Sequence, residues 1–111
     1  MARARGTYQR GLVAVLRDKD AQGGLRQMLQ AVHWLDIASP HEAAAAPWWI
    51  AGALIEALGA RRLDVSDARI RGVLPRIERE MKRVVDRGPE AQPDTGLMRD
   101  MLFHLAEVER P

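Results

Sequence analysis

Apolar residues recur at helical spacing along nearly the whole chain, and they divide it into five segments. Residues at i, i+3, i+4 and i+7 share one face of a helix, so this rhythm predicts amphipathic helices that each bury one side. No segment alternates apolar and polar residues over the length of a strand. We therefore predict an all-α fold, a single-domain bundle of about five helices over residues 1–111 with an ordered core of about residues 4–109.

The first two predicted helices are separated by a polar segment that contains two glycines. The first helix covers residues 3–17, and the second reaches about residue 37. Between them, DKDAQGG at residues 18–24 is typical of a turn, in which Gly23 and Gly24 would adopt positive φ. The residues expected to be buried are Tyr8, Leu12, Val15 and Leu16, then Leu25, Met28, Leu29, Val32 and Leu35.

The third predicted helix contains residues 43–55, AAAAPWWIAGALI, without a charged side chain. Exposing apolar surface on every side costs roughly 25 cal/mol per Å², so this helix should be the central one that the others surround. Trp48 and Trp49 are expected to anchor the core against different neighbours; the alternative is an exposed aromatic docking surface. A membrane span needs about 20 strongly apolar residues, so we predict no membrane insertion.

Capping residues and a proline set the expected course of this central helix. Ser39, Pro40 and Glu42 form a capping box that would begin it. Gly59 would end it at the preceding residue. Because Pro47 cannot donate a backbone hydrogen bond, it predicts a kink near residues 43–46 or a late restart.

The fourth predicted helix has the longest apolar pattern, from an N-cap at Asp64 or Ser66 to a stop at Gly88 and Pro89. Pro75 should bend it, and a break into a short and a longer helix is the alternative. The final helix would cover residues 95–109, capped by Asp94 or Thr95. Its expected buried stripe is Leu97, Met98, Met101, Leu102, Leu105 and Val108.

The composition excludes several classes of function. There is no cysteine, so disulfides and thiolate chemistry are ruled out. The start, MARARGTYQR, lacks the apolar region of a secretory signal, so we expect a cytoplasmic protein. The formal net charge is only +2, and acids are interleaved with the basic residues of each helix. A nucleic-acid binder would separate them, so we predict no nucleic-acid partner.

The chain offers few residues for chemistry. His41 and Glu42 are followed by alanines, so the second histidine of a zinc-protease helix is missing. Ser39 and Ser66 are explained as helix caps, and Gly23 and Gly24 are not followed by the Lys of a phosphate-binding loop. We therefore predict no enzyme, no cofactor and no metal site.

One surface of the fourth helix is a candidate docking face. Arg69, Arg76 and Arg83 lie seven residues apart, opposite the apolar stripe. We define the basic stripe as Arg69, Arg76, Arg79, Lys82, Arg83 and Arg87. It would bind an acidic or phosphorylated protein; the alternative is a solvated face partly neutralised by Glu78, Glu80 and Asp86.

Four ordered blocks resemble a known protein family. They are YQRGLVAVLR from Tyr8, GLRQM from Gly24, PWWIAGALIEAL from Pro47 and LMRDMLFHLA from Leu97, and residues 63–85 are similar as well. They resemble a helical module in the N-terminal part of type IV pilus chemosensory histidine kinases of the ChpA/PilL type, which is also found in the related FimL scaffold proteins.

The resemblance implies a non-catalytic scaffold or interaction domain in twitching-motility, two-component signalling. Its partners would be proteins of a pilus chemosensory or polar scaffold complex, and its fold would be related to histidine phosphotransfer bundles. The chain is either a free-standing module or part of a larger kinase or scaffold, and both alternatives stay open.

The second hypothesis is a phosphotransfer protein of a phosphorelay, with His33 or His104 as phosphoacceptor. Such modules present His-x-x-Lys-Gly on an exposed helix, and neither histidine is followed by Lys and Gly at those positions. An acid three residues after His33 or His104 would repel the phosphoryl group.

Overall fold

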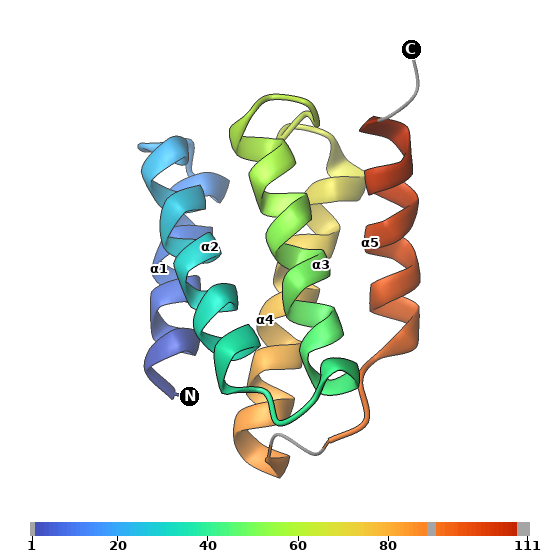
Figure 1. Cartoon of the computed structure of the whole chain (residues 1–111). Coiled ribbons are helices and arrows are strands. Elements are labelled where there is room, and N and C mark those ends of the chain that lie inside the picture. The colour runs from blue at the N-terminus through green and yellow to red at the C-terminus, as the bar shows by residue number, and fades with distance from the viewer. Residues whose placement is uncertain (1, 89–90, 109–111) are drawn as a thin grey trace.

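The computed structural model describes residues 2–88 and 91–108, which form five helices and no strand (Figure 1). The helices are α1 (Ala2–Leu16), α2 (Ala21–Ala38), α3 (Glu42–Gly59), α4 (Ala68–Arg87) and α5 (Thr95–Val108). The predicted all-α bundle is confirmed. Pro89 and Glu109, at which two of the predicted helix ends were placed, lie outside the described residues.

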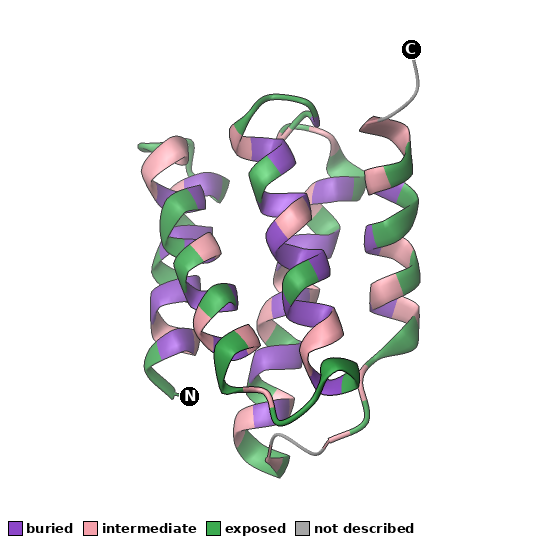
Figure 2. Ribbon diagram, viewed as in Figure 1, coloured by how far each residue is buried: buried purple, intermediate pink, exposed green. Residues whose placement is uncertain are grey.

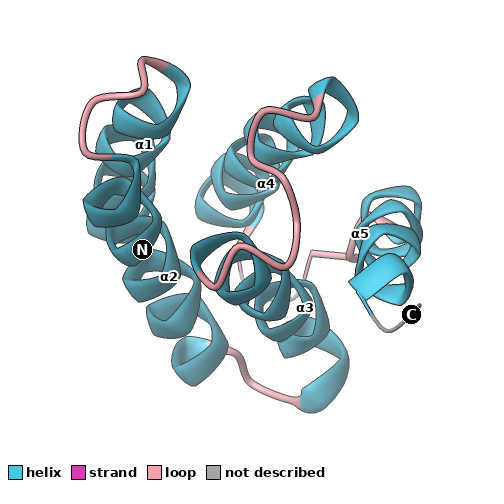
Figure 3. Ribbon diagram, turned by 90° about the horizontal axis from the view of Figure 1, so that it is seen from above, coloured by secondary structure: helices cyan, strands magenta, loops and turns pink. Residues whose placement is uncertain are grey.

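The helices form a ring around one apolar core. In the view along the bundle, α2 lies between α1 and α3, and α5 lies on the other side of α3 (Figure 3). The main contacts of α4 are with α1 and α5, which closes the ring in the order α1, α2, α3, α5, α4. The core includes Tyr8, Met28, Leu35, Leu54, Leu74, Ile77, Met81 and Met101, all of which are completely buried.

Helix α3 is the most buried of the five (Figure 2), but it is one member of the ring and is not surrounded by the other four as predicted. Ten of its 18 residues are buried, compared with three of the 14 residues of α5. Both indoles were expected to lie in the core. Trp48 does, at 3 % exposed, but Trp49 is 55 % exposed, so the prediction is wrong for Trp49. Successive residues point about 100° apart on a helix, and a helix in a ring keeps an outer stripe that no neighbour covers.

The amphipathic faces match the sequence pattern with two exceptions. Leu16 and Leu102 were expected to be buried but are 38 % and 48 % exposed. Leu16 is the last residue of α1, beyond the reach of the core. On α5 the buried stripe turns toward Leu97, Met101 and His104, which leaves Leu102 outside.

The turn between α1 and α2 differs from the prediction. Helix α2 begins at Ala21, so Gly23 and Gly24 are helical, and the positive φ angles belong to Asp18 (53°) and Asp20 (56°). The carboxylate of Asp20 caps α2 by accepting a hydrogen bond of 3.1 Å from the backbone N–H of Gly23. Aspartate tolerates this left-handed conformation better than most residues, so no glycine is needed in the turn.

Glycine instead serves the packing of α1 against α2. A Cβ atom on Gly11 would lie 2.4 Å from the carbonyl oxygen of Gly24, and a Cβ on Gly24 would lie 2.6 Å from that of Gly11. Real Cβ atoms do not come this close to backbone atoms. The two helices therefore cross with their backbones in contact, at a point where no other residue fits.

The N-cap of helix α3 lies two residues after the predicted one. His41 is the N-cap, and its Nδ1 atom accepts from the backbone N–H of Ala44 at 3.2 Å. Ser39 ends α2 instead, where its hydroxyl donates to the carbonyl of Leu35 at 2.7 Å. Helix α3 continues unbroken through Pro47, so the late restart is wrong and the kink stays a prediction.

The C-terminus of α3 lies at Gly59, one residue beyond the prediction. The residue that turns the chain is Arg61, with a φ of 59°. The backbone N–H groups of Arg61 and Arg62 donate to the carbonyls of Leu58 and Ala57, at 3.1 and 2.9 Å. This is the Schellman pattern, which satisfies the last carbonyls of the helix.

Helix α4 begins after Asp67, whose carboxylate caps it by accepting from the N–H of Arg69 at 2.9 Å. The predicted N-caps are wrong, because Asp64 accepts from Ser66 within the preceding turn. The helix continues through Pro75, so the predicted break is wrong, while the bend stays a prediction. It ends at Gly88, with a φ of 93°, as predicted.

Helix α1 is fixed to α4 by a buried tyrosine. The Tyr8 hydroxyl donates to the carbonyl oxygen of Leu74 at 2.8 Å. Burial, with a smaller contribution from Glu78, raises the pKa of Tyr8 well above its ordinary value, so the donor keeps its proton. At the edge of this contact, Glu78 accepts from Arg5 and Gln9 of α1 at 2.7 and 2.9 Å.

Candidate interaction surfaces

Two cations of the basic stripe join α4 to α5. Arg76 donates to Asp100 at 2.7 Å, and this hydrogen bond is the main reason why the pKa of Asp100 lies below its ordinary value. Arg69 pairs with Asp67 at 3.1 Å and reaches Glu107 of α5 at 4.0 Å. Both arginines therefore use their charge within the domain.

A third cation, Arg83, holds the connection between α4 and α5. It donates through Nε and Nη2 to the two carboxylate oxygens of Glu80, at 2.8 and 2.9 Å, and also to the carbonyl of Gln92. Glu80 is only 5 % exposed and also accepts from the N–H of Asp94 at 2.9 Å. Hydrogen bonding to Glu80 raises the pKa of Arg83 above its ordinary value. Asp94 in turn caps α5, as predicted, by accepting from Leu97 at 3.0 Å.

The remaining cations of the basic stripe are more open. Lys82 pairs with Asp86 one turn away at 3.0 Å, and both side chains are about half exposed. Arg79 and Arg87 are exposed and form no ion pair with the described residues. Three acids were expected to neutralise the basic stripe. Glu80 and Asp86 pair with its cations, whereas Glu78 binds α1. Asp100, which pairs with Arg76, was not predicted.

The two candidate phosphoacceptors lie on different helices and in opposite environments. His33 is exposed on α2, whereas His104 on α5 is 5 % exposed, with its Nδ1 atom lacking a hydrogen-bond partner among the described residues. The ring of Phe103 meets that of His104 edge to face, with centroids 5.7 Å apart. A buried imidazole is closed to a phosphoryl donor, so of the two only His33 is accessible.

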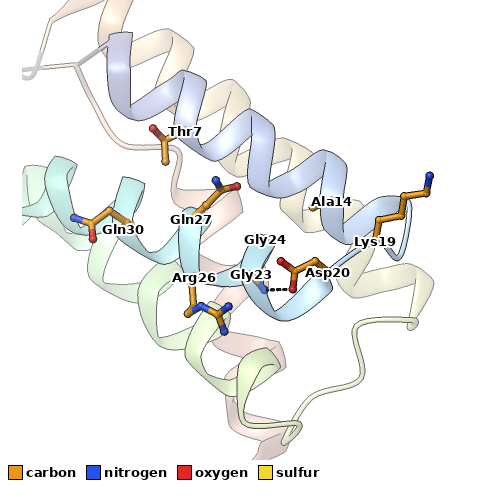
Figure 4. Close-up of a pocket in the computed structure, with 9 residues that line it drawn as sticks. All are labelled: Thr7, Ala14, Lys19, Asp20, Gly23, Gly24, Arg26, Gln27 and Gln30. Carbon is orange, nitrogen blue, oxygen red and sulfur yellow. Dashed lines mark hydrogen bonds between the residues drawn. The ribbon is translucent and has the colours of Figure 1, made fainter.

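Among the described residues, no three His, Asp or Glu side chains gather in a way that could hold a metal ion. A polar hollow of about 520 Å³ lies between α1 and α2, where Lys19, Asp20 and Arg26 border it (Figure 4). The carboxylate of Asp20 is occupied as the cap of α2, and the other polar side chains there are two cations, two amides and one hydroxyl.

Comparison with protein families identifies the chain. The family model for the FimL scaffold protein second domain matches residues 1–111. The chain belongs to this family. Comparisons with curated proteins and with solved structures gave no match. Among the described residues of this FimL-family domain, no helix has the length and apolar character needed to cross a bilayer.

The FimL-family domain also exposes large apolar side chains. Trp49 of α3, Ile37 of α2 and Phe103 of α5 are 55 %, 69 % and 57 % exposed. Trp49 borders a hollow of about 200 Å³ between α2 and α3, which we name the α2/α3 groove. It is lined from α2 by Leu29, Val32, His33 and Asp36, and from α3 by Trp48, Trp49, Gly52, Ala53 and Glu56.

Proposed function

We propose that this domain is a non-enzymatic scaffold module that binds protein partners in type IV pilus chemosensory signalling in the cytoplasm. The observation that supports this most strongly is the match to the FimL scaffold family over residues 1–111. It agrees with the small number of buried polar side chains among the described residues, and with the lack there of a His, Asp and Glu cluster that could hold a metal ion.

We further propose that part of the partner binding uses the open end of the basic stripe. Arg79 and Arg87 are exposed, eight residues apart on α4, and without an ion pair among the described residues. Lys82 lies between them and is paired only with exposed Asp86, a contact worth about 0.5 kcal/mol that a partner carboxylate can replace. The proposed partner surface is acidic.

The test is capture of purified pilus chemosensory and polar scaffold proteins by the immobilised domain. The Arg79→Glu/Arg87→Glu variant should lose an acidic partner. Its matched control is Arg17→Glu/Arg26→Glu, which reverses one exposed arginine in the turn after α1 and one on α2 and should keep the partner. Retention by both variants would refute docking through the basic stripe, and no capture by the unaltered domain would refute the scaffold function.

The phosphorelay alternative is tested in the same preparations. It would use His33, because His33 is the exposed histidine of the two candidates. Incubation with a phosphorylated receiver should give no phosphohistidine. A phosphorylated domain whose label disappears in His33→Gln would establish the alternative instead.

A further inference from the structure

At the floor of the α2/α3 groove, Gly52 lies beside Leu29 and Val32. A Cβ on Gly52 would lie 3.7 Å from Leu29 and 3.8 Å from Val32, in ordinary van der Waals contact. These three residues help to line the hollow of about 200 Å³. The exposed ring of Trp49, three residues before Gly52, borders the same hollow.

The groove has one acid near each end. Helices α2 and α3 are antiparallel (Figure 1), and Gly52 lies level with Val32. Asp36 lies four residues beyond Val32 on α2, and Glu56 lies four residues beyond Gly52 on α3, in the opposite direction. At 1.5 Å per residue, the two carboxylates are about 12 Å apart along the groove. Neither forms an ion pair with the described residues.

This arrangement defines the chemistry of an occupant. We propose that the α2/α3 groove binds an amphipathic helix of a partner protein with an apolar side chain between two Lys or Arg residues seven positions apart. Two such cations are about 10.5 Å apart on one face, and their long side chains extend the reach to the acids. The apolar residue between them packs against Trp49. This inference rests on the proposed scaffold function and names a kind of partner for it.

The basic stripe of a second copy fits the groove less well. The basic stripe of α4 offers cations, but α4 has no exposed apolar side chain beside Arg79 and Arg87 to cover Trp49. An exposed indole is the kind of side chain that contributes most to helix-in-groove interfaces. The occupant is therefore basic and apolar, unlike the acidic partner of the basic stripe.

The test uses a synthetic helical peptide with Lys at two positions seven apart, Leu at the third and fourth positions between them, and Ala and Gln elsewhere. Titrated into the whole domain, it should shift the NMR signals of the Trp49 indole N–H, Ala53 and Glu56. Trp49→Ala should weaken binding about tenfold or more. Asp36→Asn/Glu56→Gln should weaken it about fivefold at low salt, and less at 0.5 M salt.

Matched variants keep this test specific. Phe103→Ala removes an equally exposed aromatic from α5, and Asp18→Asn/Asp86→Asn removes two exposed acids elsewhere; both should bind as the unaltered domain does. All four variants should keep the thermal unfolding midpoint, since none of the side chains that they change is fully buried.

Three results of the peptide titration would overturn the inference. They are no binding of the peptide, equal binding by Trp49→Ala, and equal binding of a peptide with Glu in place of Lys. Self-association of the free domain that Trp49→Ala abolishes would also overturn it, because the occupant would then be a second copy. The peptide experiment contains no pilus protein, so its failure leaves the scaffold proposal standing.

Discussion

Helices α1 and α2 meet through glycine and apolar side chains, whereas α4 and α5 are joined by charged side chains as well. At the first interface the backbones touch where Gly11 faces Gly24. At the second, Arg76 reaches Asp100, and buried Glu80 gathers Arg83 and the start of α5. Both pairs follow a short connection in the chain, so the difference lies in the side chains and not in the topology.

The comparison separates two ways of fixing a helix pair. Close backbone contact depends on volume, so a single added methyl disrupts it, while pH and salt leave it unchanged. A polar interface tolerates small changes of volume but depends on every charge having its partner. Each interface should therefore fail under a different perturbation.

The largest effect is expected from Glu80→Ala at the α4–α5 interface. It removes the acceptor of the N–H of Asp94 and one of the two acceptors of Arg83, at a carboxylate that is itself only 5 % exposed. Losing these hydrogen bonds to a charged acceptor costs about 3 kcal/mol of the free energy of unfolding. Urea denaturation followed by circular dichroism measures this loss.

The matched control for Glu80 is Asp86→Ala on the same helix. Asp86 is 55 % exposed and pairs only with Lys82, so its loss should change stability by less than about 1 kcal/mol. Equal effects of the two substitutions would show that the burial of Glu80 is not what stabilises the interface.

A smaller loss is expected from Gly24→Ala at the α1–α2 interface. The new methyl group would lie 2.6 Å from the carbonyl oxygen of Gly11, so the helices must move apart, at a cost of about 1–3 kcal/mol. The control is Gly72→Ala in α4, where nothing lies within 4 Å of the added atom. Because alanine favours helix, this control should raise stability by about 0.5–1 kcal/mol. A stabilising Gly24→Ala would contradict the close approach.

The smallest effect is a pH dependence confined to the α4–α5 interface. The pKa of Asp100 is lowered in the folded state by its hydrogen bond from Arg76, so this pair stabilises the fold at a pH above the ordinary Asp value of about 3.9. The stabilisation is lost as the pH falls through the lower, folded-state pKa.

Urea unfolding across pH 7 to 2 checks this prediction. The difference between the unaltered domain and Asp100→Asn should be present at pH 7, begin to shrink below about pH 4 and disappear only below the lowered folded-state pKa. The loss caused by Gly24→Ala should stay constant over the same range, because no titrating group lies in that contact. A constant Asp100→Asn difference down to pH 2 would refute the role of the pair.

The helical pattern predicted most of this architecture because burial of one face controls where helices form. Helix boundaries were harder to predict, because several residues near each end can cap. Ser39 and His41 both had suitable side chains, and tertiary packing selected His41. The turn at Asp18 and Asp20 used aspartate in a conformation usually taken by glycine, which left Gly24 for the helix contact.

The surfaces were only partly predictable. The basic stripe lies on α4 as expected, but composition does not reveal which cations are engaged by α5. The burial of Glu80 could have been predicted from its spacing. Glu80 shares a helix face with buried Ile77, Met81 and Val84, at a position that points to the core. His104 follows Leu97 and Met101 on α5 in the same way. A polar residue that the helical spacing places on the buried face is therefore a better indicator of a side chain engaged within the fold than charge alone.

The central claim is that the exterior of the domain, and not a reaction centre, performs its function. The most direct test is capture of purified pilus chemosensory and polar scaffold proteins by the unaltered domain, by His33→Gln/His104→Gln and by Arg79→Glu/Arg87→Glu. The account predicts that the domain without these histidines keeps a partner that the charge-reversed domain loses. Loss of the partner in the histidine variant, with full retention in the charge-reversed one, would contradict it.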